Sequence, residues 1–237
     1  MLTSKAHHNY KFSIVLPVLN EENNIKTLLF LIKKHLKNFK YEIIFVDDNS
    51  VDSTKKIIKT YVSRNIKYFL RKKNKDLSLS CFLGIEKSKY KNIIIMDSDL
   101  QHHPKYLPQM INLYFKKKLD FVVAVRNFKE DIGLGVIRKF SSVFLSIFFN
   151  YFLGYRVSDP MSGFFIFKKS IYYKYRHFLF GKGWKILADL IYNKEKFLIE
   201  ELQIKFLTRS ENKSKMNLKV LIDVIKLFLF KFRSLKI

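Results

Sequence analysis

The chain has 237 residues, 48% of them hydrophobic, and a formal net charge of +25. This length and composition argue against intrinsic disorder and allow one large α/β domain with a real core. The single cysteine, Cys81, excludes an internal disulfide framework and indicates a reducing compartment. The polar residues 1–12 predict no secretory leader, and no apolar run reaches the roughly 18 to 20 residues that span a bilayer.

The first half of the chain alternates short apolar runs with segments of helical spacing. The runs predict strands at 12–18, 41–46, 66–70, 92–96 and 120–125. Helices are predicted between them at 25–36, 53–62, 77–87 and 104–117, with Asp52 or Ser53 capping the second and Pro104 starting the fourth. This alternation is typical of a mainly parallel sheet covered by helices.

After residue 126 the regular alternation of predicted strands and helices ends. We predict a long helix at 134–153, a strand at 163–167, a helix around 184–192, a strand at 197–206 and a C-terminal amphipathic helix. Residues 140–153 are dense in large apolar side chains. That stretch fits a core helix and a helix in the membrane interface equally well.

Two aspartates follow the predicted strand at 92–96. Because side chains alternate along a strand, Asp97 and Asp99 are expected to face the same way and Ser98 the other. Two converging carboxylates suit a hard divalent cation, which could in turn hold a diphosphate. An isolated D-x-D is as often a loop with two solvated acids, so this motif alone leaves both interpretations open.

Two other predicted strands also end in acidic residues, at Glu21 and Glu22 and at Asp47 and Asp48. Ligands of open α/β sheets bind outside the carboxyl ends of the strands, so three acidic ends at one edge predict one site. The chain has no glycine-rich phosphate loop and no C-x-x-C pair. A nucleotide would then be held by a metal on its diphosphate and by carboxylates at its base or ribose.

The segments IVLPVLNEENNI (14–25), FVDDNSVDST (45–54) and MDSDLQHHP (96–104) resemble family 2 of the glycosyltransferases, which have the GT-A fold. The later segments DPMSGFFIF (159–167), GWKIL (183–187) and RSENKSK (209–215), with Arg126 and Arg138, resemble the dolichol-phosphate mannose synthases and related polyprenyl-phosphate glycosyltransferases. The resemblance covers roughly residues 12–218. It implies an α/β GT-A domain at 1–215, with a mainly parallel central sheet flanked by helices. An amphipathic, membrane-interfacial helix is expected at 216–237.

The resemblance also implies roles for single residues. The implied nucleotide-sugar contacts are Pro17, Leu19, Glu21, Val46, Asp47, Asp48 and Ser98. The implied ligands of Mg²⁺ or Mn²⁺ are Asp97, Asp99 and Gln101. The cations implied to neutralise the departing diphosphate are Arg209 and Lys215. The groups implied to hold the phosphate of a lipid acceptor are Arg126, Arg138 and Ser142. The residues expected to matter most for catalysis are Asp99, Arg126 and Arg138.

Two positions depart from the family pattern. Leu19 stands where the family often has Tyr, so an aromatic contact to the base is missing. Asn212 replaces the Gly of R-x-x-G-x-S-K, although asparagine tolerates the left-handed conformation better than most residues. Both changes weaken the inference of nucleotide identity more than that of reaction class.

The implied reaction is inverting transfer of a hexose, with GDP-mannose as the expected donor, onto a polyprenyl or dolichyl phosphate. The alternatives are UDP-glucose or another nucleotide sugar as donor, and a protein or polysaccharide as acceptor. We expect a cytoplasmic protein, peripheral on the cytoplasmic face of the membrane, where basic residues favour anionic lipid. A basic nucleic-acid-binding protein is a remote alternative that rests on the charge alone, because no basic-aromatic binding motif stands out.

Overall fold

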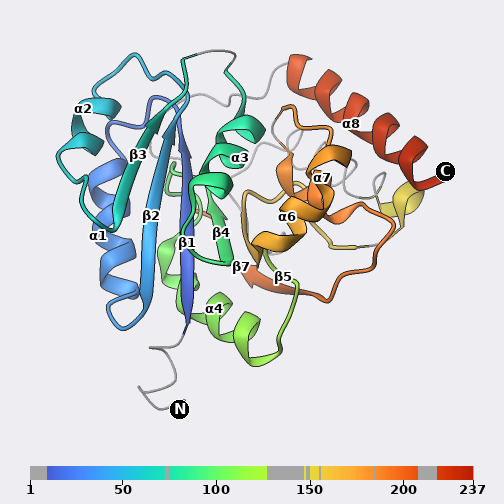
Figure 1. The fold of residues 1–237 in the computed structure, drawn as a ribbon, viewed down its shortest axis with the longest axis horizontal. Coiled ribbons are helices and arrows are strands. Elements are labelled where there is room, and N and C mark those ends of the chain that lie inside the picture. Colours follow the sequence, from blue (N-terminus) through green and yellow to red (C-terminus); the bar gives the residue numbers. More distant parts are fainter. Residues whose placement is uncertain are drawn as a thin grey trace.

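The computed structural model describes residues 10–72, 75–126, 147, 150–154, 156–183, 185–207 and 218–236. The core of the molecule is a seven-stranded sheet with helices on both faces (Figure 1). Its strand order is β3 (Ile66–Leu70), β2 (Lys40–Asp47), β1 (Lys11–Val18), β4 (Asn92–Met96), β6 (Phe164–Lys168), β5 (Phe121–Arg126) and β7 (Ile199–Ile204). All strands run parallel except β6, which is antiparallel to both β4 and β5. The prediction of a mainly parallel sheet is therefore confirmed.

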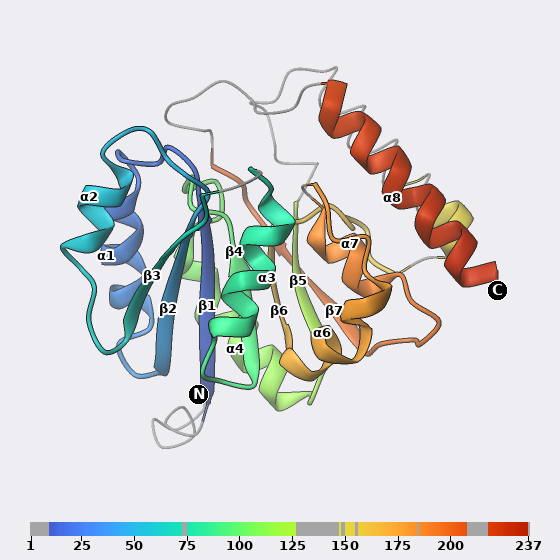
Figure 2. The same ribbon diagram turned by 45° about the horizontal axis from the view of Figure 1, so that its top comes forward.

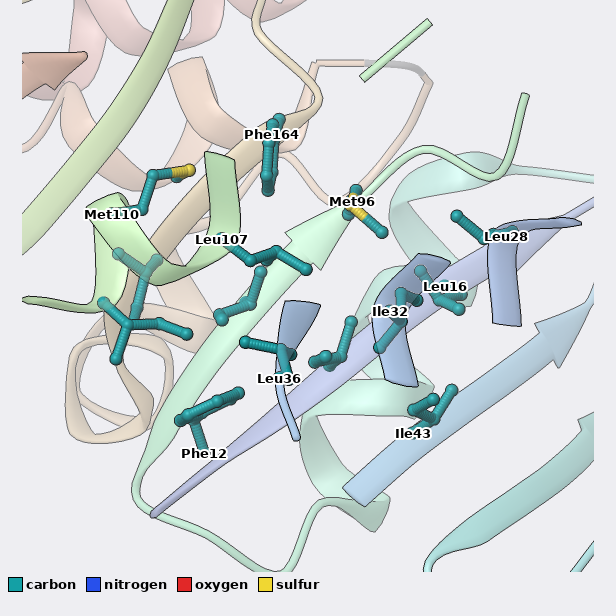
Figure 3. Close-up of a cluster of buried hydrophobic side chains, with 14 of the residues drawn as sticks. Phe12, Leu16, Leu28, Ile32, Leu36, Ile43, Met96, Leu107, Met110 and Phe164 are labelled. Atoms are coloured by element: carbon teal, nitrogen blue, oxygen red, sulfur yellow. The ribbon is translucent and has the colours of Figure 1, made fainter. Parts of the chain in front are cut away.

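Both faces of the sheet are covered, which explains why its strands are apolar in nearly continuous runs. Along β1, Phe12, Ile14 and Leu16 pack into a cluster with α1 (Ile25–His35) and α4 (Leu107–Lys116), which Figure 3 shows. Val15 faces the other way and packs against α3 (Leu77–Lys87). Small side chains are required there, because a Cβ on Gly84 of α3 would lie 2.3 Å from Cγ1 of Val15.

The first half of the chain follows the expected elements closely. The bounds of β3, α3 and β4 agree with the predicted ones, whereas α2 (Thr54–Lys59) ends earlier than expected. The helix expected at 104–117 begins with the short 3-10 turn η2 (Pro104–Tyr106), where Nδ1 of His103 accepts the N–H of Lys105 at 3.0 Å. Ser53 is the N-cap of α2 but makes no side-chain capping bond, whereas Oδ1 of Asp52, the residue before it, accepts the N–H of Thr54 at 3.0 Å.

The second half contains one helix that the sequence did not suggest. Helix α6 (Lys169–Tyr175) follows β6 without an intervening loop and continues into the turn η3 (Arg176–Phe178). Helix α7 (Ile186–Ile191) and helix α8 (Leu218–Lys236) agree with the expected positions, and α8 lies beside α7 (Figure 2). Of the helix predicted at 134–153, the structure describes residues 147 and 150–153, which are helical. In the part of the chain that the structure describes, no helix is long and apolar enough to cross a membrane.

Candidate active site

The carboxyl ends of β1, β2, β4 and β5 lie at one edge of the sheet, because these strands run in the same direction. A residue with a left-handed backbone follows three of them: Asn20 (φ 56°), Asn49 (φ 65°) and Leu100 (φ 63°). Asparagine tolerates this conformation, whereas leucine rarely adopts it. Strained backbone conformations at non-glycine residues cluster at functional sites, so Leu100 indicates that the loop after β4 belongs to such a site.

The loops after β1 and β2 are joined by hydrogen bonds. Oδ1 of Asn20 accepts the N–H of Val51 at 2.9 Å, and Oγ1 of Thr54 accepts the N–H of Glu21 at 2.7 Å. Oε2 of Glu21 accepts the side-chain amide of Asn24 at 2.7 Å, and Glu21 is only 5% exposed. The predicted nucleotide contact Glu21 therefore also stabilises the loop that carries it.

The two aspartates at the end of β2 have different environments. Asp47 is fully buried, and its carboxylate accepts the N–H of Ser50 and the hydroxyl of Tyr68, both at 2.8 Å. Those two bonds shape the turn. Asp48 is buried beside Arg71, and burial raises the pKa of its carboxyl while the guanidinium acts in the opposite direction. Val46 and Pro17, the neighbouring predicted contacts, are buried, whereas Leu19 is half-buried.

The residues of the D-x-D motif make different contacts. Ser98 is buried, and its hydroxyl donates to the carbonyl of Pro17 at 2.9 Å, which ties β4 to β1. The Asp97 carboxylate lies against the backbone of Gly163, where an added Cβ would come within 2.2 Å of Oδ2. Oδ1 of Asp99 accepts the N–H of Gln101 at 3.1 Å. Gly163 is a site residue to which the sequence analysis gave no role.

An aromatic cluster packs against the loop after β4. His102 is buried between Phe164 and Phe206, with ring-centroid distances of 5.4 and 4.7 Å, and its Nδ1 lies 3.6 Å from Oδ2 of Asp97. Burial lowers the pKa of His102 to about 4, so the ring is neutral near pH 7. The guanidinium of Arg126 lies over the ring of Phe206, with its carbon 4.1 Å from the ring centroid. The cluster therefore connects the loop after β4 with Arg126 at the end of β5.

Two charged residues without an assigned role also belong to this site. Asp159 is buried, and burial raises the pKa of its carboxyl, whereas Lys185 and Arg126 lower it. Burial lowers the pKa of the Lys185 ammonium, against the opposing effect of Asp159 and Asp97. Both residues lie in segments quoted for the family resemblance, DPMSGFFIF and GWKIL, which is the signal that could have identified them.

The structure therefore brings most of the predicted site residues to one edge of the sheet. Pro17, Leu19, Glu21, Val46, Asp47, Asp48, Asp97, Ser98, Asp99, Gln101 and Arg126 all lie there. The predictions for Arg138, Ser142, Arg209 and Lys215 lie outside the described residues.

The residues after β4 suit a divalent cation that also needs ligands from a substrate. Among the residues that the structure describes, no three His, Cys, Asp or Glu side chains form a ready metal-binding cluster. Mg²⁺ is commonly held by one or two carboxylates together with substrate phosphates, so a complete protein cage is not required. The Asp97 side chain is 34% exposed, so it is accessible to a ligand from solvent.

A parallel sheet with one antiparallel strand and acidic loops at its carboxyl edge places a ligand site at that edge. The sequence pattern of Glycosyl transferase family 2 matches residues 13–176. The chain belongs to this family, and it has the GT-A fold.

Two relatives share its sequence over most of its length. Dolichol-phosphate mannosyltransferase from Pyrococcus furiosus is 27% identical over 91% of this chain and 62% of its own. Dolichol-phosphate mannosyltransferase from Mycosarcoma maydis is 27% identical over 95% of this chain and 81% of its own. The chain thus spans less than two thirds of the Pyrococcus protein.

A solved structure supports the fold assignment. Glucosyl-3-phosphoglycerate synthase from Mycobacterium tuberculosis, in complex with Mn²⁺, uridine diphosphate and phosphoglyceric acid, superposes with a TM-score of 0.75. The match covers 97% of this chain and 80% of that one at 18% identity. At this identity, the comparison establishes the fold alone.

Proposed function

We propose that the protein transfers a hexose from a nucleotide diphosphate sugar to a polyprenyl phosphate, with inversion at the anomeric carbon. The observation that carries the proposal is the arrangement around Asp97, where Lys185 interacts with Asp97, Asp159 and Arg126. Acids suit a metal-bound diphosphate and cations suit an acceptor phosphate. Both sequence relatives named above are dolichol-phosphate mannosyltransferases, which supports mannose as the transferred sugar. The donor we propose is GDP-mannose, and UDP-glucose is the alternative.

The donor is expected to lie across the loops after β1, β2 and β4. Leu19 and Glu21 would line one side of the base and ribose, and Asp48 the other. Asp47 and Ser98 are occupied by bonds within the protein, so their part is to shape the loops. Asp97, Asp99 and Gln101 would hold Mg²⁺ or Mn²⁺, which supplies positive charge to the diphosphate.

The acceptor is expected to approach from the side of β5. An oxygen of its phosphate forms a bond to the anomeric carbon while the bond from that carbon to the diphosphate oxygen breaks. The nucleoside diphosphate leaves with the electron pair. Because the second pKa of a phosphate monoester is about 6, the attacking oxygen is already anionic at neutral pH and needs no strong base. Arg126, with the predicted Arg138 and Ser142, would hold this phosphate in line, and Arg209 and Lys215 would stabilise the leaving group.

The lipid acceptor requires access to a membrane surface. Helix α8 exposes Ile225 (49%) and Leu229 (48%), and the adjacent Phe152 (48%) contacts Phe228 of α8 with ring centroids 5.7 Å apart. We propose that this face lies on the cytoplasmic side of a membrane, where apolar burial and basic residues both favour binding.

Vesicle flotation tests the membrane contact. The chain should float with anionic vesicles at low salt. Replacing Ile225 and Leu229 by serine should weaken flotation, whereas Phe30→Ser, which removes a more exposed apolar side chain on α1 (63%), should not. Equal flotation of all three proteins would contradict the assignment of this face.

The reaction is tested with vesicles that contain polyprenyl phosphate and with labelled GDP-mannose or UDP-glucose. Label should enter the organic extract only with Mg²⁺ or Mn²⁺ present, and chelation should abolish the transfer. A water-soluble product formed with phosphoglyceric acid, and no labelled lipid with either donor, would instead show that the acceptor is a small phosphorylated molecule.

A further inference from the structure

Asp76, the N-cap of α3, joins segments that are far apart in the sequence. Its Oδ1 accepts the N–H of Leu79 at 3.1 Å, which caps the helix. Its Oδ2 accepts the N–H of Gly183 at 2.7 Å, from a residue 107 positions further along the chain. Its own backbone N–H donates to Oδ2 of Asp48 at 2.6 Å. One residue therefore connects the end of β2 with the segment before α7.

Arg71 completes the surroundings of Asp48. Its Nη1 contacts Oδ1 of Asp48, and it also donates to the carbonyl of Asp76 at 2.9 Å and to Oγ of Ser80 at 3.0 Å. Each oxygen of Asp48 is thus held by a group outside its own loop. The Ser80 side chain also hydrogen-bonds to this carboxylate, and Asp48 is only 6% exposed. The direction in which Asp48 presents its oxygens to a ligand depends on Arg71 and Asp76.

Gly183, the partner of Asp76, lies between α3 and α8. Its carbonyl accepts both the N–H and the hydroxyl of Ser78, each at 3.0 Å. Its φ is +87°, and an added Cβ would lie 3.2 Å from Cβ of Asp223 on α8. A side chain here would be strained and would press on α8. The segment below α8 is therefore fixed to α3 through backbone groups.

We propose that Asp76 is a positioning residue for the donor nucleotide. Its backbone holds Asp48, and its carboxylate ties that arrangement to the Gly183 segment on which α8 packs. The inference rests on the proposed function, because Asp48 matters in this way only if a nucleotide binds beside it. Asp76 itself touches no substrate. Its contribution is orientation, so its loss should affect donor affinity more than the rate of the chemical step.

Two substitutions separate the cap of α3 from the bridge to Gly183. In Asp76→Ser the short hydroxyl can still cap α3 but cannot reach Gly183 at the same time. In Asp76→Glu both carboxylate oxygens remain as acceptors, one for each of the two N–H groups. Loss of one hydrogen bond is expected to raise the Kd for nucleoside diphosphate and the donor KM about three- to tenfold in Asp76→Ser, with kcat nearly unchanged. Asp76→Glu should lie closer to the wild type than Asp76→Ser.

The matched control is Asp120→Ser, at the opposite edge of the sheet. Asp120 also bridges two segments, since it accepts the N–H of Leu198 at 2.9 Å and the ammonium of Lys168 at 2.6 Å. Its loss should leave nucleotide affinity unchanged. A second variant, Ser78→Ala, removes the hydroxyl bond to Gly183 without touching the cap and should weaken donor binding about twofold to threefold. It also decides the question if Asp76→Ser does not fold.

The measurement is calorimetric titration of the full chain with UDP and with GDP in the presence of Mg²⁺, alongside thermal unfolding of each variant. A wild type that binds neither nucleotide would overturn the proposed function and, with it, the role of Asp76. A wild type that binds while Asp76→Ser binds equally well would overturn the role of Asp76 alone. Equal loss of affinity in Asp76→Ser and Asp120→Ser would also overturn it, because general destabilisation would then explain both.

Discussion

The two halves of the sheet contribute differently to the proposed function. In the half formed by β1 to β4, buried carboxylates accept hydrogen bonds from backbone and hydroxyl groups, as Glu42 does from Ser13 and Asp47 does from Ser50. In the half around α7 and α8, aromatic packing is supplemented by the buried ion pair between Lys231 and Asp189, 2.9 Å apart. Hydrogen bonds are directional, whereas apolar packing is not. The first half can therefore orient the loops of the proposed donor site, and the second supplies the apolar surface proposed to contact a membrane.

The largest expected effect on stability comes from breaking the buried ion pair with Lys231→Met. Lys231 is fully buried, and Asp189 would keep only the N–H groups of Phe180 and Gly181. An unpaired buried charge costs about 3 to 5 kcal/mol, and these two remaining bonds favour the lower end. Urea unfolding measures the change. Pairing the substitution with Asp189→Leu should recover part of the loss, and no recovery would show that the charge is not its cause.

Asp97→Asn should have the largest effect on activity with little effect on stability. The substitution removes the charge expected to hold the metal and keeps the shape that fits against Gly163. Loss of such an electrostatic contribution lowers kcat/KM by on the order of 100-fold or more. Transfer of labelled sugar at several Mg²⁺ concentrations is the measurement. Activity that stays at the wild-type level would remove Asp97 from the metal site.

Gly163→Ala tests whether the missing side chain at Gly163 is needed to position the Asp97 carboxylate. The added Cβ would lie 2.2 Å from Oδ2 of Asp97, so the side chain must move. Displacing a metal ligand indirectly is expected to lower metal affinity about 10- to 100-fold. Saturating Mn²⁺ should then restore part of the activity, which it cannot do for Asp97→Asn. The same metal dependence as the wild type would mean that the loop adapts without consequence.

The smallest expected effect is the pH dependence contributed by Glu42. Burial raises the pKa of its carboxyl, but bonds from Lys67, Ser13 and the N–H of Lys89 together hold it below the ordinary value of 4.5. A depressed folded-state pKa stabilises the protein above pH 4.5, and this contribution is lost as the pH falls through the folded-state pKa. Unfolding measured from pH 7 to pH 3 should show a shallower decline for Glu42→Gln than for the wild type. Parallel curves would contradict this role.

Local patterns in the sequence were sufficient for most elements of the first half. The strands β3 and β4 and the helix α3 lie where the apolar periodicity placed them. Helix α6 was missed because residues 169–175 follow β6 without a turn signal. The order of the strands and the antiparallel direction of β6 depend on pairings between distant segments, which no local pattern contains.

The candidate site was likewise predictable only in part from local patterns in the sequence. Asp48, Asp97 and Asp99 could be identified because each lies at or just after the end of an apolar strand, and parallel strands bring their ends to one edge. The roles of Gly163 and Asp76 could not. Gly163 matters because the antiparallel register of β6 sets it beside the carboxylate of Asp97. Asp76 matters because a residue 107 positions away folds back onto it.

By itself, the sequence determined the kind of fold, the family and the acidic strand ends, because these depend on local periodicity and short motifs. The tertiary structure decided which partners each of those acids has. The oxygens of Asp47 accept hydrogen bonds from Ser50 and Tyr68, and the carboxylate of Asp97 lies against the backbone of Gly163. Asp48 accepts a hydrogen bond from the backbone of Asp76, outside its own loop. The physical reason is that a hydrogen bond requires its partners within about 3 Å, and only long-range packing sets that distance.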